Sequence, residues 1–435
     1  MKTAYPSILF CKGEEYMKTK AVRLYGENDL RLEEFELPQI KSDEILMKVV
    51  ADSICMSSYK AAIQGAKHKR VPNDVAENPV MIGHEFCGEL VEVGEKWKNN
   101  FSAGQKVTIQ PAIPNNGYDS PGYSYHYCGG DATYIILPAE VMENDCLLPY
   151  DGEGYFCGAL SEPSSCVIGA YHANYHTTAG VYEHKMGIVE GGKLALLASV
   201  GPMGLAAVDY AIHADRKPSV MVVTDINQER LDRAASIFTV EEAAKNGIKL
   251  TYVNTGACED PVKELMELSG GTGYDDVVVF APVPALIEQA DDILGHDGCL
   301  NFFSGPTTPD FKAKFNFYDV HYDATHLVGT SGGNTDDMKE SLKMMSEGRL
   351  TAAALVTHIG GLNATEYATL NLPKIPGGKK LIYTHLDMPL TAISDFEEKG
   401  KTDPLFAELA KLVSKTNGLW NVEAEAYLLE NAKKI

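Results

Sequence analysis

Short apolar runs alternate with helix-like stretches through the middle of the chain. The strand-like runs are Leu194 to Ser199, Val220 to Thr224, Asp276 to Phe280 and Leu300 to Ser304. Helical patterns begin at about Gly204 and at about Gln228. Strands that are buried on both faces read as continuous apolar runs, so this order predicts an α/β fold with a doubly wound parallel sheet covered by helices.

The two flanking regions have other patterns. Between Lys18 and about Val107, short strand-like segments are separated by glycines typical of turns, which predicts a mainly β domain. From about Asp336 the chain enters a helical stretch and then a mixed tail. We therefore expect boundaries at 17–165, 166–335 and 336–435. Because Met17 opens a strand-like segment, residues 1–16 are interpreted as an extension or a misassigned start.

Composition narrows the function. The formal net charge of -22 argues against non-specific binding to nucleic acid or to an anionic membrane surface. No apolar run approaches the roughly 20 residues of a membrane-spanning helix, and no secretory signal is visible. Nine cysteines without regular spacing do not indicate a disulfide framework. We expect a cytoplasmic protein that acts on a small molecule, without nucleic-acid or membrane partners.

The central region carries a dinucleotide-binding pattern. An apolar strand runs into a turn with two glycines, which lets a pyrophosphate approach the backbone and the next helix N-terminus. Ser199 stands where the usual pattern has its first glycine. Asp225 ends the next strand and favours NAD, because a carboxylate there binds ribose hydroxyls, while Arg230 leaves NADP open. The candidate cofactor-binding residues are Gly201, Pro202, Met203, Gly204, Asp225, Arg230, Phe280 and Ala281.

Metal-ligating residue types occur earlier in the chain. A catalytic zinc takes three protein ligands from thiolate, imidazole and carboxylate and keeps one position open. Cys55 and His84 would supply the first two, and Glu85 and Glu162 are both candidates for the carboxylate. Taken singly, each is weak, because a lone buried cysteine or histidine more often serves packing.

The order of these motifs resembles the zinc-containing medium-chain alcohol and polyol dehydrogenases. The motifs are Cys55 with Ser57, Gly83-His84-Glu85, a strand from Gly129 to Tyr134, Glu162-Pro163 and the Gly201–Leu205 turn. The resemblance implies a GroES-like catalytic domain made of 17–165 and 336–435, and a Rossmann domain at 166–335 that binds NAD(P). It also implies a site in the cleft between the domains and a homodimer or homotetramer. Glu162 matches the polyol branch.

One departure concerns a loop. Many relatives hold a structural zinc with four cysteines where this chain has Pro111–Gly130, but the loop contains only Cys128. We therefore expect one catalytic zinc per subunit and no structural zinc. The loop is rich in tyrosine, which predicts packing on itself or on a partner subunit.

The resemblance extends to a branch that acts on sugar phosphates. It is carried by Met56–Lys60, by the missing cysteines, and by Thr357–Leu362 with Pro373–Lys380. This implies reduction of a ketose 1-phosphate, such as L-sorbose 1-phosphate to D-glucitol 6-phosphate. A polyol or secondary-alcohol dehydrogenase for unphosphorylated substrates is the alternative, and a zinc-free, non-catalytic nucleotide-binding relative is an alternative of another class.

Roles for the remaining candidates follow from this resemblance and from charge. Ser57 matches the hydroxyl that passes a proton to the substrate, and Lys60 stands where some relatives have a relay histidine. Lys60 could equally contact phosphate or be solvated. The basic run Lys67, His68, Lys69 and Arg70 could supply local cations for a substrate phosphate, or form an exposed loop. His172 and His176 are interpreted as structural.

Overall fold

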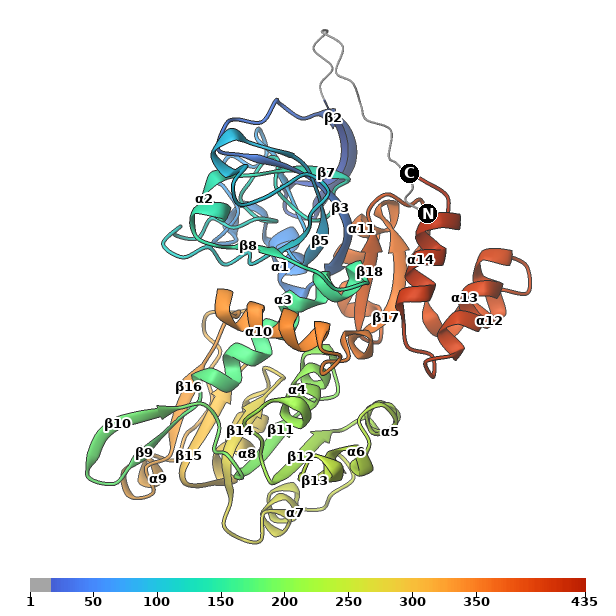
Figure 1. Ribbon diagram of the computed structural model, residues 1–435. Helices are drawn as coiled ribbons and strands as arrows, with labels where there is room; N and C mark the ends of the chain where they lie inside the picture. Colours follow the sequence, from blue (N-terminus) through green and yellow to red (C-terminus); the bar gives the residue numbers. More distant parts are fainter. Residues whose placement is uncertain (1–16) are drawn as a thin grey trace.

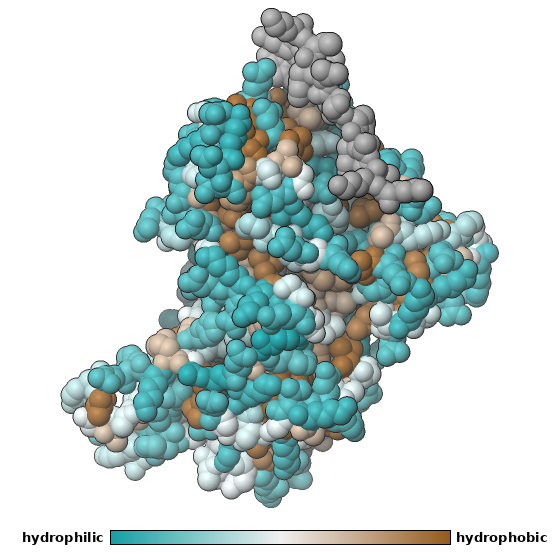
Figure 2. All heavy atoms as spheres, in the orientation of Figure 1, coloured by the Kyte–Doolittle hydropathy of each residue, from teal (hydrophilic) through white to brown (hydrophobic). Residues whose placement is uncertain are grey.

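The computed structural model describes residues 17–435, and the interpretation of residues 1–16 as an extension lies outside them. Two lobes are joined by the long helix α3, Tyr155–Ala173 (Figure 1). Hydrophilic side chains cover most of the face seen in Figure 2, as expected for an acidic chain. No helix between residues 17 and 435 is long and apolar enough to cross a membrane.

The nucleotide-binding lobe contains a six-stranded parallel sheet in the order β13-β12-β11-β14-β15-β16. Its strands are β11 Lys193–Leu197, β12 Val220–Asp225, β13 Lys249–Asn254, β14 Tyr274–Val279, β15 Leu294–Phe302 and β16 His326–Gly329. Its helices are α4 Pro202–His213, α5 Gln228–Ile237, α6 Val240–Lys245, α7 Pro261–Leu268, α8 Pro284–Asp292 and α9 Phe317–Tyr322. The predicted α/β fold with a doubly wound sheet is confirmed.

Alternation along β11 explains how both faces of this sheet are covered. Leu194 and Leu196 join a buried cluster with α3, α4 and α5, whereas Ala195 and Leu197 join a second cluster with α7 and α8. Successive side chains of a strand point to opposite faces, so a continuous apolar run serves both layers.

The other lobe is mainly β, as predicted. An eight-stranded sheet runs β19-β17-β18-β3-β5-β6-β8, with β7 also paired to β3, and a small sheet runs β2-β1-β4. The first-half strands are β1 Lys18–Gly26, β2 Asp29–Glu36, β3 Ile45–Ile54, β4 Val80–Met81, β5 Phe86–Val93, β6 Lys106–Ile109, β7 Tyr134–Leu137 and β8 Leu147–Pro149. The short helices here are α1 Met56–Gln64 and α2 Ala139–Glu143.

The C-terminal part returns to this lobe. The strands β17 Val356–Gly361, β18 Lys379–Tyr383 and β19 Thr391–Ala392 complete the sheet, and β18 pairs antiparallel with β3. The helices are α10 Thr335–Ser346, α11 Thr365–Leu370, α12 Phe396–Lys399, α13 Pro404–Ser414 and α14 Val422–Asn431. The two ends of the described chain therefore build one lobe.

Three local expectations differ from the structure. The boundary expected at residue 165 falls inside α3, which continues through Pro163. Helix α4 begins at Pro202 rather than near Gly204, because proline is well suited to the first position of a helix. The strand expected from Gly129 begins only at Tyr134.

Beyond these elements, β9 Tyr175–Thr178 and β10 Val181–Met186 form an antiparallel hairpin beside β15 and β16. Helix α10 packs along α3, where His172 Nδ1 lies 2.8 Å from an Asp337 carboxylate oxygen. His176 lies 3.2 Å from Asp276 within the nucleotide-binding lobe. Both histidines therefore have structural partners.

Candidate active site in the cleft

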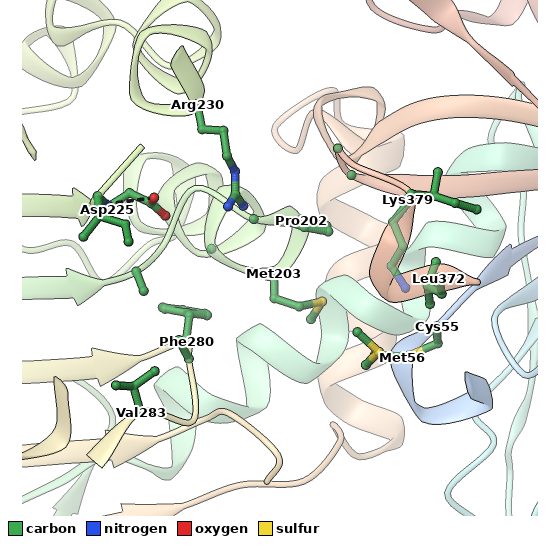
Figure 3. Close-up of a pocket in the computed structure, with 18 of the residues that line it drawn as sticks. Cys55, Met56, Pro202, Met203, Asp225, Arg230, Phe280, Val283, Leu372 and Lys379 are labelled. Carbon is green, nitrogen blue, oxygen red and sulfur yellow. Dashed lines mark hydrogen bonds between the residues drawn. The ribbon is translucent and has the colours of Figure 1, made fainter. Parts of the chain in front are cut away.

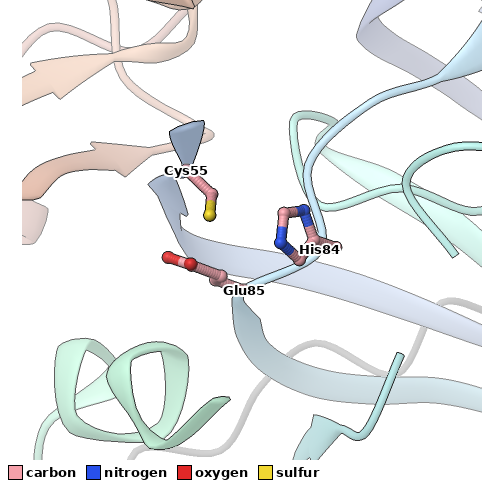
Figure 4. Close-up of side chains that lie close together, drawn as sticks. All are labelled: Cys55, His84 and Glu85. Atoms are coloured by element: carbon pink, nitrogen blue, oxygen red, sulfur yellow. The ribbon is translucent and has the colours of Figure 1, made fainter. Parts of the chain in front are cut away.

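Three ligand types meet at the carboxyl end of β3. Cys55 lies between β3 and α1, and His84 and Glu85 directly precede β5 (Figure 4). Their candidate ligand atoms, one sulfur, one ring nitrogen and one carboxylate oxygen, all lie within 4.8 Å of one another. The antiparallel pairing of β3 with β5 brings these segments together.

Glu85 already has a cationic partner. Lys379 from β18 places Nζ 2.5 Å from each Glu85 carboxylate oxygen, and the Ser53 hydroxyl donates to the same carboxylate. Both members of the pair are buried, with side chains 5% and 1% exposed. Burial alone would raise the pKa of Glu85, but the charges of Lys379 and His84 and the hydrogen bonds from Lys379 and Ser53 together hold this pKa below its usual value.

Glu162 is a second buried carboxylate near the cluster, although it is not one of the three converging ligands. Burial raises its pKa to about 7, partly offset by His84. Its hydrogen-bond partner is the Cys166 thiol, at 3.6 Å. No Lys, Arg or His nitrogen within residues 17–435 lies within 4.0 Å of it, so this carboxylate lacks an ion-pair partner.

The residues fit a divalent metal ion. Burial raises the pKa of the Cys55 thiol, so Cys55 and Glu162 both resist ionisation until a cation is near. With Zn²⁺ bound, two positive charges would offset the Cys55 thiolate and one carboxylate, and Lys379 would offset the other carboxylate. This donor set of sulfur, nitrogen and oxygen is one that zinc uses in catalytic sites.

Hydroxyl groups border the cluster. Ser57 Oγ donates to Cys55 Sγ at 3.0 Å and lies 3.3 Å from His84 Nε2. The Tyr123 hydroxyl donates to Ser57 Oγ at 2.8 Å. Ser58 Oγ lies 3.3 Å from His84 Nδ1. Of the α1 hydroxyls, that of Ser57 is therefore nearest to the converging ligands. This is the residue that the sequence analysis predicts as the proton donor.

The structure separates the basic run. Arg70 lies over the Tyr123 ring, 5.1 Å from its centroid, and so reaches the wall of the metal site. Lys69 lies 5.4 Å from the centroid of the exposed Tyr118 ring. Lys67 forms an exposed ion pair with Glu27 at 2.5 Å and has a carboxylate partner of its own.

One other cationic group, Lys60, and the neutral His68 also face this region. Lys60 donates to the Gly305 carbonyl at 2.7 Å, which joins α1 to the nucleotide-binding lobe. Burial, together with Arg70, Lys69 and Lys60, lowers the pKa of His68 to about 4. These three cations therefore create a positive field around His68. Within residues 17–435, no carboxylate lies within 4.0 Å of a nitrogen of Lys60, Lys69 or Arg70.

A cavity of about 640 Å³ runs from the nucleotide-binding turn to the metal cluster (Figure 3). All eight predicted cofactor residues line it. The wall also contains Ile54, Cys55, Met56, Ala198, Thr224, Ile226, Thr255, Val283, Leu286, Leu372, Ile375, Gly377, Gly378, Lys379 and Lys380. One cavity therefore joins the expected cofactor site to Cys55.

The turn shows why two glycines suffice. A Cβ on Gly204 would lie 2.1 Å from the Ser199 carbonyl oxygen, so helix α4 approaches the strand closely there. A Cβ on Gly201 would meet only Arg230 Nη2, at 3.4 Å, and would otherwise occupy open cavity space. Ser199 is buried and donates to the Leu196 carbonyl at 2.9 Å, so a serine is accommodated at the first position.

The tyrosine-rich loop adds a side chain that the sequence did not identify. Tyr123 packs on His84 with ring centroids 4.9 Å apart. Cys128 is buried, and among residues 17–435 it belongs to no group of three converging ligand atoms. Tyr125 donates to Glu140 in α2 at 2.9 Å, so part of the loop packs against its own lobe.

Lys379, Ser53 and Tyr123 are the site residues that sequence reasoning missed. Lys379 lies in the Pro373–Lys380 motif, but its role as the partner of Glu85 depends on the pairing of β18 with β3. No local pattern in the sequence indicates that pairing.

Two family models match the chain: a zinc-binding dehydrogenase domain at residues 202–347 and an alcohol dehydrogenase GroES-like domain at 41–147. A mannitol-1-phosphate 5-dehydrogenase of Aliivibrio fischeri is 53% identical over 95% of this chain and 98% of its own length. An L-sorbose 1-phosphate reductase of Klebsiella pneumoniae is 49% identical over 96% and 98%.

A solved structure of 2R,3R-butanediol dehydrogenase from Bacillus subtilis has the same fold, with a TM-score of 0.67 and 23% identity over 84% of this chain and 99% of that one. The GroES-like and Rossmann architecture expected from the motifs is thus confirmed. The chain is a dehydrogenase that belongs to the zinc-binding, medium-chain alcohol and polyol dehydrogenase family.

Proposed function

We propose that this dehydrogenase interconverts a ketose phosphate and a polyol phosphate with a nicotinamide cofactor. L-Sorbose 1-phosphate and D-glucitol 6-phosphate are one candidate pair, and the named substrates of the two relatives support this class. The observation that carries the proposal is the group of Lys60, Lys69 and Arg70, cations without carboxylate partners that surround His68. His68 stacks on Tyr123, whose other neighbour is the candidate ligand His84. In a chain with net charge -22, such cations favour an anionic substrate.

One zinc ion would be held by Cys55, His84 and Glu85, with Glu162 as the carboxylate beside them. Zinc held by these residues would supply polarisation of the substrate carbonyl, and a bound nicotinamide would supply hydride to its carbon. Lys379 and Ser53 hold the Glu85 carboxylate in place. Among residues 17–435, Cys128 belongs to no group of three converging ligand atoms, which supports a single zinc per subunit.

Ser57 would hold the proton that the new alcohol oxygen receives. Its Oγ lies 3.0 Å from Cys55 Sγ, at the edge of the ligand cluster, and it can therefore reach an oxygen bound there. Lys60 would act at a distance from this oxygen, because its Nζ is hydrogen-bonded to Gly305 in the other lobe. Lys60 is therefore proposed as a contact for the substrate phosphate rather than as a proton carrier.

Arg70 and Lys69 would complete the phosphate site, and Lys67 would not take part because Glu27 neutralises it. Arg70 is the main phosphate contact, since it is half-buried beside Tyr123.

NAD is the proposed cofactor. Asp225 ends β12 with one oxygen bound to the Ile226 and Asn227 amides at 2.9 and 3.0 Å, and it lines the cavity. A carboxylate in this place disfavours the 2′-phosphate of NADP. Arg230 also lines the cavity, so replacement of Asp225 by Ser is expected to increase use of NADPH.

A dimer or tetramer is the proposed assembly. Strand β16 is the outer strand of the parallel sheet, and the hairpin and α9 flank it in Figure 1. Exposed apolar side chains here are Val181, Tyr182, Met186, Phe317, Tyr318, Tyr322 and Leu327. A second copy placed against the same edge would pair the open strand and cover these side chains.

The test is NADH and NADPH oxidation by zinc-loaded protein with sorbose 1-phosphate, fructose 1-phosphate and the free ketoses. We expect turnover with the ketose phosphates. The kcat/KM for the free ketoses should be at least about tenfold lower, because one charge-assisted contact is lost. Arg70→Ala should remove this preference, whereas Lys67→Ala should keep it. Equal rates for phosphates and free ketoses would instead assign the chain to unphosphorylated polyols. If the purified protein binds no zinc and turns over none of these substrates, the alternative of a non-catalytic nucleotide-binding relative would be supported.

A further inference from the structure

The tyrosine-rich loop places one side chain against the metal site that the proposed chemistry does not yet use. We infer that Tyr123 is a positioning residue, which holds the Ser57 hydroxyl in the orientation needed for proton transfer. The inference rests on the proposed function of Ser57 as the proton donor.

The loop is locked onto the segment that carries His84. Gly122 has φ +78°, and a Cβ there would lie 2.1 Å from the Gly83 carbonyl oxygen and 3.0 Å from His84 Cβ. Ser124 Oγ also donates to the Arg70 carbonyl at 2.7 Å. Because only glycine permits this approach, the next residue, Tyr123, is fixed against the site with 2% exposure.

The two faces of the Tyr123 ring are occupied by neighbours. His84 lies at 4.9 Å between ring centroids, His68 stacks at 5.8 Å with an interplanar angle of 10°, and Arg70 lies at 5.1 Å. These contacts leave the hydroxyl as the part of the side chain that points at α1. Tyr123 therefore lies between the proposed phosphate contact, Arg70, and the proposed proton donor, Ser57.

The hydrogen bonds of Ser57 define the role of the Tyr123 hydroxyl. A serine hydroxyl has one hydrogen and two acceptor lone pairs. Tyr123 donates to Ser57 Oγ at 2.8 Å and so occupies one lone pair. The single hydrogen of Ser57 then points toward Cys55 Sγ, at 3.0 Å, on the side where the candidate ligand atoms converge. Both hydroxyls also lie 3.3 Å from His84 Nε2, a longer contact than either of these two hydrogen bonds. Tyr123 thus holds the Ser57 hydroxyl on the side of the ligand cluster, where a substrate oxygen would bind.

Tyr123→Phe removes the hydroxyl and keeps the ring between Arg70 and His84. We expect kcat with a ketose phosphate to fall about tenfold. This is less than the full rate enhancement from general acid catalysis, because Ser57 itself is still present. KM should stay within about twofold, because the ring still supports Arg70. The solvent deuterium isotope effect on kcat should rise, since proton transfer becomes slower. Zinc content and zinc affinity should not change.

Tyr125→Phe is the matched control. This residue lies on the same loop, and its hydroxyl donates to Glu140 rather than to the site. Tyr125→Phe should therefore keep the kcat, KM and isotope effect of the wild type. A crystal structure of zinc-loaded Tyr123→Phe should show Ser57 in a changed or mixed side-chain orientation.

Several results would overturn the inference. These are a Tyr123→Phe protein with wild-type kcat and isotope effect, an unchanged Ser57 orientation, or a loss of zinc, which would make Tyr123 a support for His84 alone. Failure of the wild type to use sugar phosphates is a separate result that overturns the proposed substrate. In that case, the kcat of the same variants is measured with the secondary alcohol that the wild type does oxidise. The orientation of Ser57 in their crystal structures is compared as before.

Discussion

The nucleotide-binding turn and the metal cluster are joined by one cavity, which Cys55 of the cluster lines, but they are built in different ways. The turn and its acid, from Ser199 to Asp225, come from one strand-helix-strand unit. The metal cluster and its neighbours come from four separate segments, which contain Cys55, His84–Glu85, Glu162 and Lys379. The first site depends on local backbone geometry, and the second depends on sheet pairing and helix packing. A change in either site should therefore leave the other largely intact.

The largest effect should follow removal of a proposed zinc ligand. His84→Ala should lower kcat at least about a hundredfold, because stabilisation of the developing charge is lost. The affinity for NADH should stay within about threefold, since the turn at Gly201 and Gly204 does not contact His84. Metal analysis and NADH fluorescence titration measure the two quantities. His184→Ala, on the exposed hairpin, is the control, and equal loss of NADH binding in His84→Ala would contradict the separation of the sites.

Loss of the cation beside Glu85 should come next. Lys379→Met leaves a carboxylate with 1% exposure without its partner, which should cost about 3 kcal/mol of unfolding free energy. Urea denaturation of the metal-free protein measures this cost. The double variant with Glu85→Gln should recover part of it, because the uncompensated charge is gone. A Lys379→Met protein as stable as the wild type would show that the ion pair is not required.

A matched break in the nucleotide-binding lobe is Gly204→Ala. The new Cβ would lie 2.1 Å from the Ser199 carbonyl oxygen, so the turn must shift away from α4. We expect NADH affinity to fall about tenfold, or about 1.4 kcal/mol, with zinc content unchanged. Isothermal titration with NADH provides the measurement. Wild-type NADH affinity would mean that the turn tolerates the shift, and a loss of zinc would contradict the independence of the two sites.

The smallest effect concerns pH. The hydrogen bond with Asp337 raises the pKa of His172 above its usual value. The folded protein thus holds this proton more tightly than the unfolded chain, so the contribution is present below about pH 6.5 and is lost as pH rises through the raised pKa. His172 is half-exposed, so the effect should stay below about 1 kcal/mol. His172→Gln should flatten the dependence of Tm between pH 6 and 9, and an unchanged slope would exclude His172 as its source.

The two sites also differ in how far the sequence predicts them. The parallel sheet, the turn and Asp225 were predicted because each depends on a short pattern within one unit. Cys55 and His84 were identified through the order of family motifs. Lys379 and Tyr123 were missed because their places depend on the pairing of β18 with β3 and on the docking of a loop. The boundary expected at residue 165 was placed where the sequence pattern changes, and such a change does not reveal that one helix, α3, continues from one lobe into the other.

The most direct test of the central claim is X-ray absorption at the zinc edge on the purified, zinc-loaded protein. We expect one zinc per chain with a single sulfur ligand at about 2.3 Å and nitrogen or oxygen ligands at about 2.0–2.2 Å. The sulfur contribution should disappear in Cys55→Ser. Zinc with two or more sulfur ligands, or a sulfur contribution that remains in Cys55→Ser, would contradict the assignment of Cys55, His84 and Glu85 as the metal site.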